Sequence, residues 1–443
     1  MFKGSKLKKA TLFVTIVSLV TVVIGFGVQR RCAAQASGGN DYESIELFTD
    51  VLAIVKKSYV EEVDTKKLIY GAINGMLTSL DPHSSFMPPD TYKEMKIDTK
   101  GAFGGLGIEI TVKDGILTVI SPIEDTPASK AGIKAGDQIL KIDDKFTKDL
   151  TITDAVKRMR GVKGTKVTLT IMREGFEKTK EFTLERDIIQ VKSVKYKVLD
   201  DGYGYIRISQ FQEKTDEDLD KALKALEPDN KPLRGLVLDL RNDPGGLLDQ
   251  AVRVCEHFVG EGKLIVYTEG REKDSQMRFV SKKGGKEAEY PIVVLINSGS
   301  ASASEIVAGC LQDHKRAVVM GTQSFGKGSV QTIIPLSDNS GLRLTTARYY
   351  TPSGRSIQAK GITPDITAEK VEITVTPEKK EGMHIREKDL ENHFENDKKE
   401  GSDDKKVKPA PYKTDEAIKG DSQILRALDL LKGWDILKVM GKA

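Results

Sequence analysis

Apolar and polar residues follow three different patterns along the chain, and each pattern predicts a different structure. Between residues 41 and 95, apolar residues recur every three or four positions, which predicts an N-terminal helical region. Between 96 and 186, short alternating runs lie between glycine and aspartate turns, which predicts a β-rich module with short helices. From 187 to 370, apolar strands alternate with amphipathic helices, which predicts an α/β core with a mixed sheet covered by helices. The predicted fold class is therefore α+β and multidomain.

The two ends of the chain differ from its middle. Residues 1–36 combine a basic start, an apolar run (10–28) and an Ala-Gln-Ala sequence typical of a signal-peptide cleavage site. The apolar run is long enough to span a bilayer, so a cleaved signal peptide and a retained inner-membrane anchor both stay open. Either one predicts an extracytoplasmic, periplasmic protein. Residues 376–412 predict a charged flexible linker, and residues 413–443 predict a C-terminal helix that packs on the core.

Composition narrows the function only slightly. A chain of 443 residues predicts two to four domains, and a net charge of +4 gives no reason to expect a nucleic-acid partner. Of five histidines, His384 and His393 lie in the predicted linker, so few remain for catalysis. No metal site and no cofactor is predicted. Cys255 and Cys310 lie among apolar residues, which favours buried free thiols over a disulfide.

Three polar loops follow apolar strands of the predicted core, where the sites of such sheets usually lie. Loop 241–246 ends in two glycines, loop 297–302 is rich in serine and precedes a predicted helix, and loop 321–328 carries Lys327. We expect the chemistry of the protein to lie in these loops.

Lys327 allows two interpretations. Gly321, Gly326 and Lys327 match the spacing of a phosphate-binding loop, but that motif requires Ser or Thr at the next position and then a helix. Gly328 occupies that position, and residues 330–336 have the pattern of a strand. The sequence therefore argues against a nucleotide site.

Ser302 also allows two interpretations. Ser302 and Glu305 match a helix capping box, which explains both residues without catalysis. The start of a helix also favours a nucleophile, because its partial positive charge stabilises a developing oxyanion. Three nearby serines leave the choice of nucleophile open on local grounds: Ser298, Ser300 and Ser304.

A serine nucleophile needs a base. Neither His257 nor His314 is accompanied by an aspartate pattern typical of a catalytic triad. A neutral lysine can replace histidine. Burial in an apolar loop lowers the pKa of a lysine, and Phe325 and a scarcity of nearby acids would suit this at Lys327. Gln331 could hydrogen-bond the amine without adding charge.

Acyl transfer also requires backbone N–H groups that bind the oxyanion. Pro244 has no N–H, so Gly245 or Gly246 must supply one donor. Ala303, directly after Ser302, is the natural second donor.

The β-rich module contains a glycine-rich turn before a strand, GGLGIEI, followed by SPIEDTPASKAGIKAGDQILKID. Such a turn lets backbone N–H groups converge on a carboxylate, while the strand edge accepts a peptide strand. The module resembles a PDZ domain. This resemblance implies binding of an apolar C-terminal peptide tail at Leu106, Gly107 and Ile108. Arg160, just past a predicted helix, lies either near this groove or in solvent.

NSGSASASEIVAG, GTQSFGKGSVQ and DLRNDPGG, together with the PDZ-like module, resemble the carboxyl-terminal processing proteases, the tail-specific peptidases of family S41. The resemblance covers about residues 41–370 and the last helix. It implies that Ser302 is the nucleophile, Lys327 the general base and Gln331 the residue that orients the lysine. It outweighs the capping-box interpretation.

The function implied is that of an exported serine endopeptidase that cleaves proteins recruited by their apolar C-terminal tails. One alternative is a catalytically inactive PDZ scaffold, and another is a PDZ protease with a His-Asp-Ser triad. The predicted partners are protein substrates and, if the N-terminal segment is uncleaved, the membrane. An adaptor protein, a homodimer and control of activity by the PDZ domain stay open.

Overall fold

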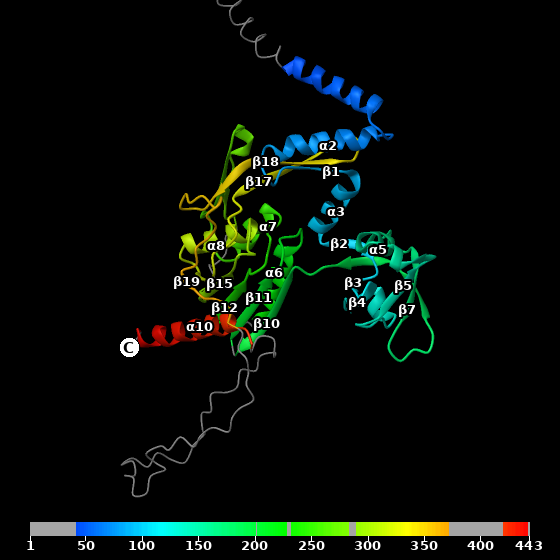
Figure 1. Cartoon of the computed structure of the whole chain (residues 1–443). Helices are drawn as coiled ribbons and strands as arrows, with labels where there is room; N and C mark the ends of the chain where they lie inside the picture. Colours follow the sequence, from blue (N-terminus) through cyan, green and yellow to red (C-terminus); the bar gives the residue numbers. More distant parts are fainter. Residues whose placement is uncertain (1–40, 201, 228–231, 283–288, 372–419, 442–443) are drawn as a thin grey trace, which may run out of the picture. The chain divides into compact units, whose positions relative to one another are not determined.

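The computed structural model describes residues 41–200, 202–227, 232–282, 289–371 and 420–441 (Figure 1). The predicted signal segment and charged linker, with His384 and His393, lie outside these residues. The chain forms two units, Met1–Phe86 and Met87–Ala443. Within the described residues, every helix is too short or too polar to span a lipid bilayer.

The first unit is helical, in agreement with its apolar periodicity. One helix covers residues 41–58, and α2 (Thr65–Thr78) follows. Asp64 caps α2 by accepting the N–H of Lys66 at 2.8 Å. The ring of Phe86 lies 4.6 Å from that of Tyr70 on α2, centroid to centroid, and this contact orders the turn after the helix.

The second unit starts with α3 (Pro89–Lys100) and the predicted β-rich module. A core of Leu106, Ile139, Leu169 and Ile171, all nearly or completely buried, fills the inside of the module. Its short antiparallel strands match the predicted alternation of apolar and polar residues. The elements are β2 (Ala102–Gly105), β3 (Ile108–Lys113), β4 (Ile116–Pro122), α4 (Pro127–Lys130), β5 (Gln138–Ile142), β6 (Lys145–Phe146), α5 (Ile152–Met159), β7 (Lys166–Met172), β8 (Lys180–Glu185) and β9 (Asp187–Gln190).

The α/β core contains a sheet with the strand order β10-β11-β12-β15-β16-β19. β10 and β11 are antiparallel, and the other pairs are parallel, so the predicted mixed sheet is confirmed. The strands are β10 (Val194–Asp200), β11 (Tyr203–Ile208), β12 (Gly235–Asp239), β15 (Ile292–Ile296), β16 (Val318–Gly321) and β19 (Ile366–Thr367).

Helices cover both faces of this sheet. Leu236 and Leu238 of β12 pack with α6 (Thr215–Leu226), α7 (Leu248–Glu256) and α8 (Ala303–Asp313). Val237, between them, points to the opposite face and packs with α10 (Ser422–Met440), as expected from the alternation along a strand. The C-terminal helix α10 thus contributes Ile424, Leu428 and Leu431 to this part of the core.

Cys255 of α7 and Cys310 of α8 are buried free thiols, as predicted. Burial raises the pKa of the Cys255 thiol well above its ordinary value, with a further contribution from the neighbouring Cys310.

A second, antiparallel sheet was not anticipated from the sequence. β17 (Ser329–Pro335) pairs with β18 (Gly341–Tyr350), which pairs with β13 (Leu264–Gly270), and β14 (Arg278–Val280) follows. β17 and β18 form a hairpin across residues 336–340, whereas the pairing of β18 with β13 joins segments far apart in the sequence and leaves no local signal. It matters for function because the Lys327 loop passes from the first sheet into the second.

Candidate active site

Ser302 occupies the sharp turn between β15 and α8. It is the N-cap residue of α8, with φ 56° and ψ −111°. A non-glycine residue with positive φ is strained, and such strain often marks a functional site. Ser302 is 7 % exposed, and its backbone N–H donates to Oε2 of Glu305 at 2.7 Å. The serine is thus held at the positive end of a helix, which favours a developing negative charge.

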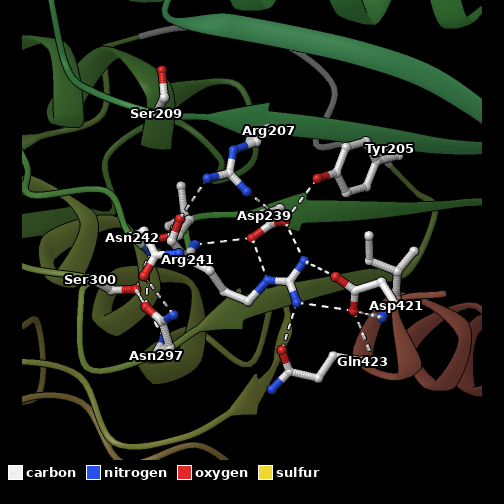
Figure 2. A network of polar contacts seen from close by, with 12 residues as sticks. Tyr205, Arg207, Ser209, Asp239, Arg241, Asn242, Asn297, Ser300, Asp421 and Gln423 are labelled. Carbon is white, nitrogen blue, oxygen red and sulfur yellow. Dashed lines mark hydrogen bonds and ion pairs between the residues drawn. The ribbon is translucent and has the colours of Figure 1, made fainter. Parts of the chain in front are cut away.

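Hydrogen bonds between Asn242 and Asn297 hold loop 241–246 against the loop that carries Ser302 (Figure 2). The backbone N–H of Asn242 donates to Oδ1 of Asn297, and Nδ2 of Asn297 donates to Oδ1 of Asn242, both at 2.9 Å. The hydroxyl of Ser300 donates to the carbonyl of Leu240 at 2.8 Å. The structure therefore brings together the two loops that the sequence predicts to be functional.

Gly245 lies directly against the nucleophile turn. A Cβ on Gly245, whose φ is +97°, would lie 2.7 Å from the carbonyl oxygen of Ala301 and 2.9 Å from the nitrogen of Ala303. The Gly245 N–H donates to Oδ1 of Asp243 at 2.8 Å. Because this bond engages the Gly245 N–H, Gly246 is the better candidate for the oxyanion donor that the sequence assigned to either glycine.

One buried carboxylate connects the serine turn to the lysine loop. Glu305 is completely buried, and Oε1 accepts the hydroxyl of Ser324 at 2.6 Å and the N–H of Gly326 at 2.7 Å. Oε2 accepts the N–H of Lys327 at 2.9 Å in addition to that of Ser302. Four donors satisfy this carboxylate, so Glu305 fixes the backbones of both candidate catalytic residues. The capping box in the sequence indicated its bond to Ser302 but gave no sign of the others.

The expected apolar burial around Lys327 is wrong in its details. Phe325 is 62 % exposed, so its ring does not shield the lysine from solvent. The expectation of few nearby acids is also wrong, because Glu305 binds the backbone of the loop. β17 begins at Ser329, directly after the loop, so a strand stands where a phosphate-binding loop needs a helix.

Gln331 and Tyr349 complete the surroundings of the lysine loop. Nε2 of Gln331 donates to the hydroxyl of Ser329 at 2.8 Å. A lysine amine would therefore donate to the amide oxygen of Gln331. The N–H of Tyr349 donates to the carbonyl of Gly328 at 2.7 Å. The Tyr349 hydroxyl lies within hydrogen-bonding distance of the Ser302 side chain, and burial raises the pKa of Tyr349 to about 12. No sequence signal pointed to Tyr349, because its contact with the serine arises from the pairing of β17 with β18.

The candidate catalytic residues line one cleft. Its volume is about 830 Å³, and Ser302, Lys327 and Gln331 contribute to its wall together with both glycines of the 241–246 loop. Apolar side chains line the neighbouring surface, among them Leu248, Phe279 and Val330. The cleft thus combines a serine hydroxyl, a lysine and two glycines of a tight turn with an apolar wall.

The histidines do not belong to this cleft. Contrary to the expectation from sequence, His257 does have an aspartate partner, with Nε2 at 2.6 Å from Oδ1 of Asp216. Nε2 of His314 lies 2.7 Å from the carbonyl of Leu264. Neither histidine is among the described residues that line the cleft. Among the described residues, no group of three or more His, Cys, Asp or Glu side chains could hold a metal ion.

A second, smaller pocket of about 100 Å³ lies in the β-rich module, between β3 and α5. Leu106, Gly107, Ile108 and Arg160 all line it. The Arg160 guanidinium carbon lies 4.4 Å from the ring centroid of Phe103. Of the two alternatives for Arg160, the structure therefore favours a position at the groove.

Comparison with known proteins decides the family. Residues 202–368 match the model of peptidase family S41, residues 104–185 match that of the PDZ domain, and residues 27–91 match that of the activating protease CtpB N-terminal domain. The carboxy-terminal-processing protease of Bartonella bacilliformis is 51% identical over 405 residues, covering 89% of this chain and 91% of the relative. The chain belongs to the carboxy-terminal processing proteases of family S41.

A second relative agrees with this assignment. The carboxy-terminal processing protease CtpB of Bacillus subtilis is 38% identical over 337 residues, which cover 75% of this protease and 69% of CtpB. A solved structure of the photosystem II D1 C-terminal processing protease matches with 30% identity and a TM-score of 0.43, over 73% of this chain and 92% of that chain. The predicted family, fold class and enzyme class are confirmed: this is a serine-type peptidase with a PDZ domain.

Proposed function

We propose that this protease is an exported endopeptidase in which Ser302 is the nucleophile and Lys327 is the general base. The observation that carries the proposal is the carboxylate of Glu305, which binds the backbone N–H of both residues at 2.7 and 2.9 Å. This shared acceptor fixes the backbones of the two residues relative to each other on the wall of one cleft. Catalysis by a nucleophile and its base requires such fixed geometry.

The reaction has two steps. The unprotonated amine of Lys327 accepts the proton of Ser302 Oγ while this oxygen forms a bond to the carbonyl carbon of the scissile peptide. The resulting ammonium then protonates the leaving amine, and the C–N bond breaks to leave an ester on Ser302. In the second step, the lysine takes a proton from water while the water oxygen forms a bond to the ester carbon. The C–O bond to Ser302 then breaks, Oγ regains a proton from the lysine ammonium, and the new C-terminus is released.

The oxyanion of each step needs preorganised donors. We assign this role to the N–H groups of Gly246 and Ala303, because the N–H of Gly245 is engaged with Asp243. Gly245 still has a role, since only a residue without Cβ permits the turn to approach the backbone of Ala303 so closely. The amide oxygen of Gln331 would accept a hydrogen bond from the lysine amine and thereby orient this amine.

Substrate selection is assigned to the PDZ groove. The wall formed by Leu106, Ile108, Val156 and Met159 is apolar, and the turn at Gly107 precedes β3, which lies at the edge of its sheet. Such a groove suits an apolar C-terminal tail that adds as a strand and places its carboxylate at the turn. Export is inferred from the N-terminal sequence, with a cleaved signal or a retained anchor as its two forms. An adaptor protein and a homodimer are compatible with this function.

The test is a cleavage assay on a purified protein substrate that ends in an apolar tail. Ser302→Ala and Lys327→Ala should each abolish cleavage without weakening tail binding to the PDZ domain. The exposed residues Ser298 and Lys370 provide matched controls, and their Ala variants should remain active. Amidation of the substrate's C-terminus should slow cleavage by removing the charge that the turn recognises. Cleavage that survives Ser302→Ala would contradict the assigned nucleophile.

A further inference from the structure

A buried acid behind the Gly245–Gly246 turn has no part in the mechanism above. The side chain of Asp243 is completely shielded from solvent. Its Oδ1 atom accepts the N–H of Gly245 at 2.8 Å. Its Oδ2 atom is the one buried side-chain N or O atom without a hydrogen-bond partner in the part of the chain that the structure describes. A carboxylate in this position would be poorly compensated, which is strongly unfavourable in a protein interior.

The groups that face Asp243 compensate a negative charge only in part: the Gly245 N–H, the Ser304 hydroxyl and the Arg207 guanidinium favour the carboxylate, but less than burial disfavours it. From α8, the hydroxyl of Ser304 donates to the main-chain carbonyl of Asp243 at 2.8 Å. From β11, the cation is Arg207, whose guanidinium already lies 3.5 Å from Oδ2 of Asp239 and 3.2 Å from the carbonyl of Arg241 (Figure 2). Burial is therefore the dominant effect, and it raises the pKa of Asp243 to about 8.

We propose that Asp243 is a positioning residue that carries a proton in the active enzyme and, in this form, holds the Gly245–Gly246 turn in the geometry that binds the oxyanion. Loss of the proton leaves a buried charge, and the turn rearranges to bring donors or solvent to Oδ2. Gly245 transmits this movement to the nucleophile, because a Cβ on it would lie only 2.9 Å from the nitrogen of Ala303. A displacement of about 1 Å can slow a reaction about 100-fold. This role rests on the proposed function, since it acts through the proposed oxyanion donors.

The pH dependence of kcat tests the role. The wild type should lose activity as the pH rises through the pKa of Asp243, about 8. Asp243→Asn has no proton to lose at this position, so it should lack this alkaline loss. Asp243→Ala cannot accept the Gly245 N–H and should lose about 10-fold or more in kcat at every pH, with KM unchanged. Asp243→Asn should recover part of that activity through its amide oxygen. An unchanged alkaline loss in Asp243→Asn would overturn the proposal.

A second measurement does not depend on peptidase activity. Because the pKa of Asp243 is raised from 3.8 to about 8 in the folded protein, the folded state retains a proton that the unfolded state has lost between these values. The stability of the wild type therefore falls as the pH rises through this interval. These measurements use a Ser302→Ala background, which should prevent self-digestion. As the pH rises, the Tm of the Asp243→Asn variant should increase relative to that of the parent that retains Asp243.

The exposed Asp144 provides a control, because Asp144→Asn removes a carboxylate from the surface and should not reproduce the effect of Asp243→Asn. Melting curves of Asp243→Asn that stay parallel to those of the parent would overturn the proposal. An infrared band of a protonated carboxyl at neutral pH, absent in Asp243→Asn, would support it. Failure of the proposed nucleophile is distinguishable, because Ser302→Ala would then retain cleavage while the melting curves still report the proton on Asp243.

Discussion

Ser302 and Lys327 donate their backbone N–H groups to the same oxygen of Glu305, at 2.7 and 2.9 Å. The two residues come from loops at the ends of adjacent parallel strands, β15 and β16. The shared acceptor makes the position of the lysine loop depend on the helix that begins at the serine. A disturbance of either loop should therefore affect the other.

Glu305→Ala should lower both stability and activity. Removal of the carboxylate leaves four donors of the site without their acceptor, at a cost of about 1–3 kcal/mol for each one that stays buried and unsatisfied. We expect a fall in Tm of many degrees and a loss of kcat greater than that of Glu305→Gln, which retains an amide oxygen. Thermal melting and the cleavage assay measure the two effects. Glu217→Ala, on the exposed side of α6, is the control, and a Glu305→Ala enzyme of normal Tm and activity would contradict this prediction.

Gly245→Ala should abolish most activity. Its Cβ would lie 2.9 Å from the Cβ of Ser302 and 2.7 Å from the carbonyl of Ala301, at a φ of +97°. The turn must move, so we expect kcat to fall about 100-fold or more, as for loss of an oxyanion donor. Gly262 is a matched control, because it also has positive φ (+77°) but no atom within 4 Å of an added Cβ.

Gly262→Ala should therefore show only the strain of the left-handed conformation, about 1 kcal/mol, and normal kcat. Equal losses of kcat in the Gly245 and Gly262 variants would mean that strain, and not the approach to the nucleophile, determines the effect.

Tyr349→Phe should slow the reaction without changing its pH profile. The hydroxyl contacts the Ser302 side chain, so its loss should reduce kcat by up to about 10-fold, which corresponds to one hydrogen bond. Because burial raises the pKa of Tyr349 to about 12, the hydroxyl stays protonated throughout the range in which the enzyme is assayed. A pH–rate profile that changes shape in Tyr349→Phe would mean that the tyrosine takes part in proton transfer.

Asp421 should make the protein less stable in acid. It precedes α10 and lies 3.0 Å from Arg241, which also donates to Gln423 at 2.6 Å (Figure 2). Burial raises the pKa of Asp421, but the hydrogen bond and charge of Arg241 outweigh it, so the pKa lies below its usual value. The stability that Asp421 supplies is therefore present at neutral pH and lost as the pH falls through the lowered pKa.

Asp421 also caps α10, because its Oδ1 accepts the N–H groups of Gln423 and Ile424. Asp421→Asn should reduce the acid-dependent loss, and Asp421→Ala should cost about 2 kcal/mol or more at neutral pH through the lost cap and ion pair. Thermal melting between pH 3 and pH 7, a range that includes the ordinary pKa of aspartate, measures both effects. Asp125→Asn, at an exposed turn with φ +61°, is the control. Identical acid dependence in Asp421→Asn and the wild type would contradict the prediction.

Secondary structure was predictable wherever it depends on neighbouring residues. Helical spacing predicts the helices of region 41–95, and alternation predicts the short strands of region 96–186, because both are local patterns. The mixed sheet followed from the order of strands and helices. The second sheet did not, since the pairing of β18 with β13 joins segments far apart in the sequence.

The site was predictable to a similar extent. Three motif-bearing loops indicated where chemistry lies, and the structure brings residues of all three to one cleft. The role of Phe325 was wrong, because exposure of a side chain in a loop depends on what packs against it. The aspartate partner of His257 was missed, because Asp216 lies on another helix.

The sequence by itself determined which residue types are available at the ends of the strands: a serine before a helix, a lysine in a glycine-rich loop and a pair of glycines after a proline. Tertiary structure alone decided how they are held. The four donors around Glu305, the contact of Tyr349 with Ser302 and the unpartnered oxygen of Asp243 all depend on packing between distant segments. Burial sets the protonation of a carboxyl through the groups that replace water around it, and those groups are chosen by the fold.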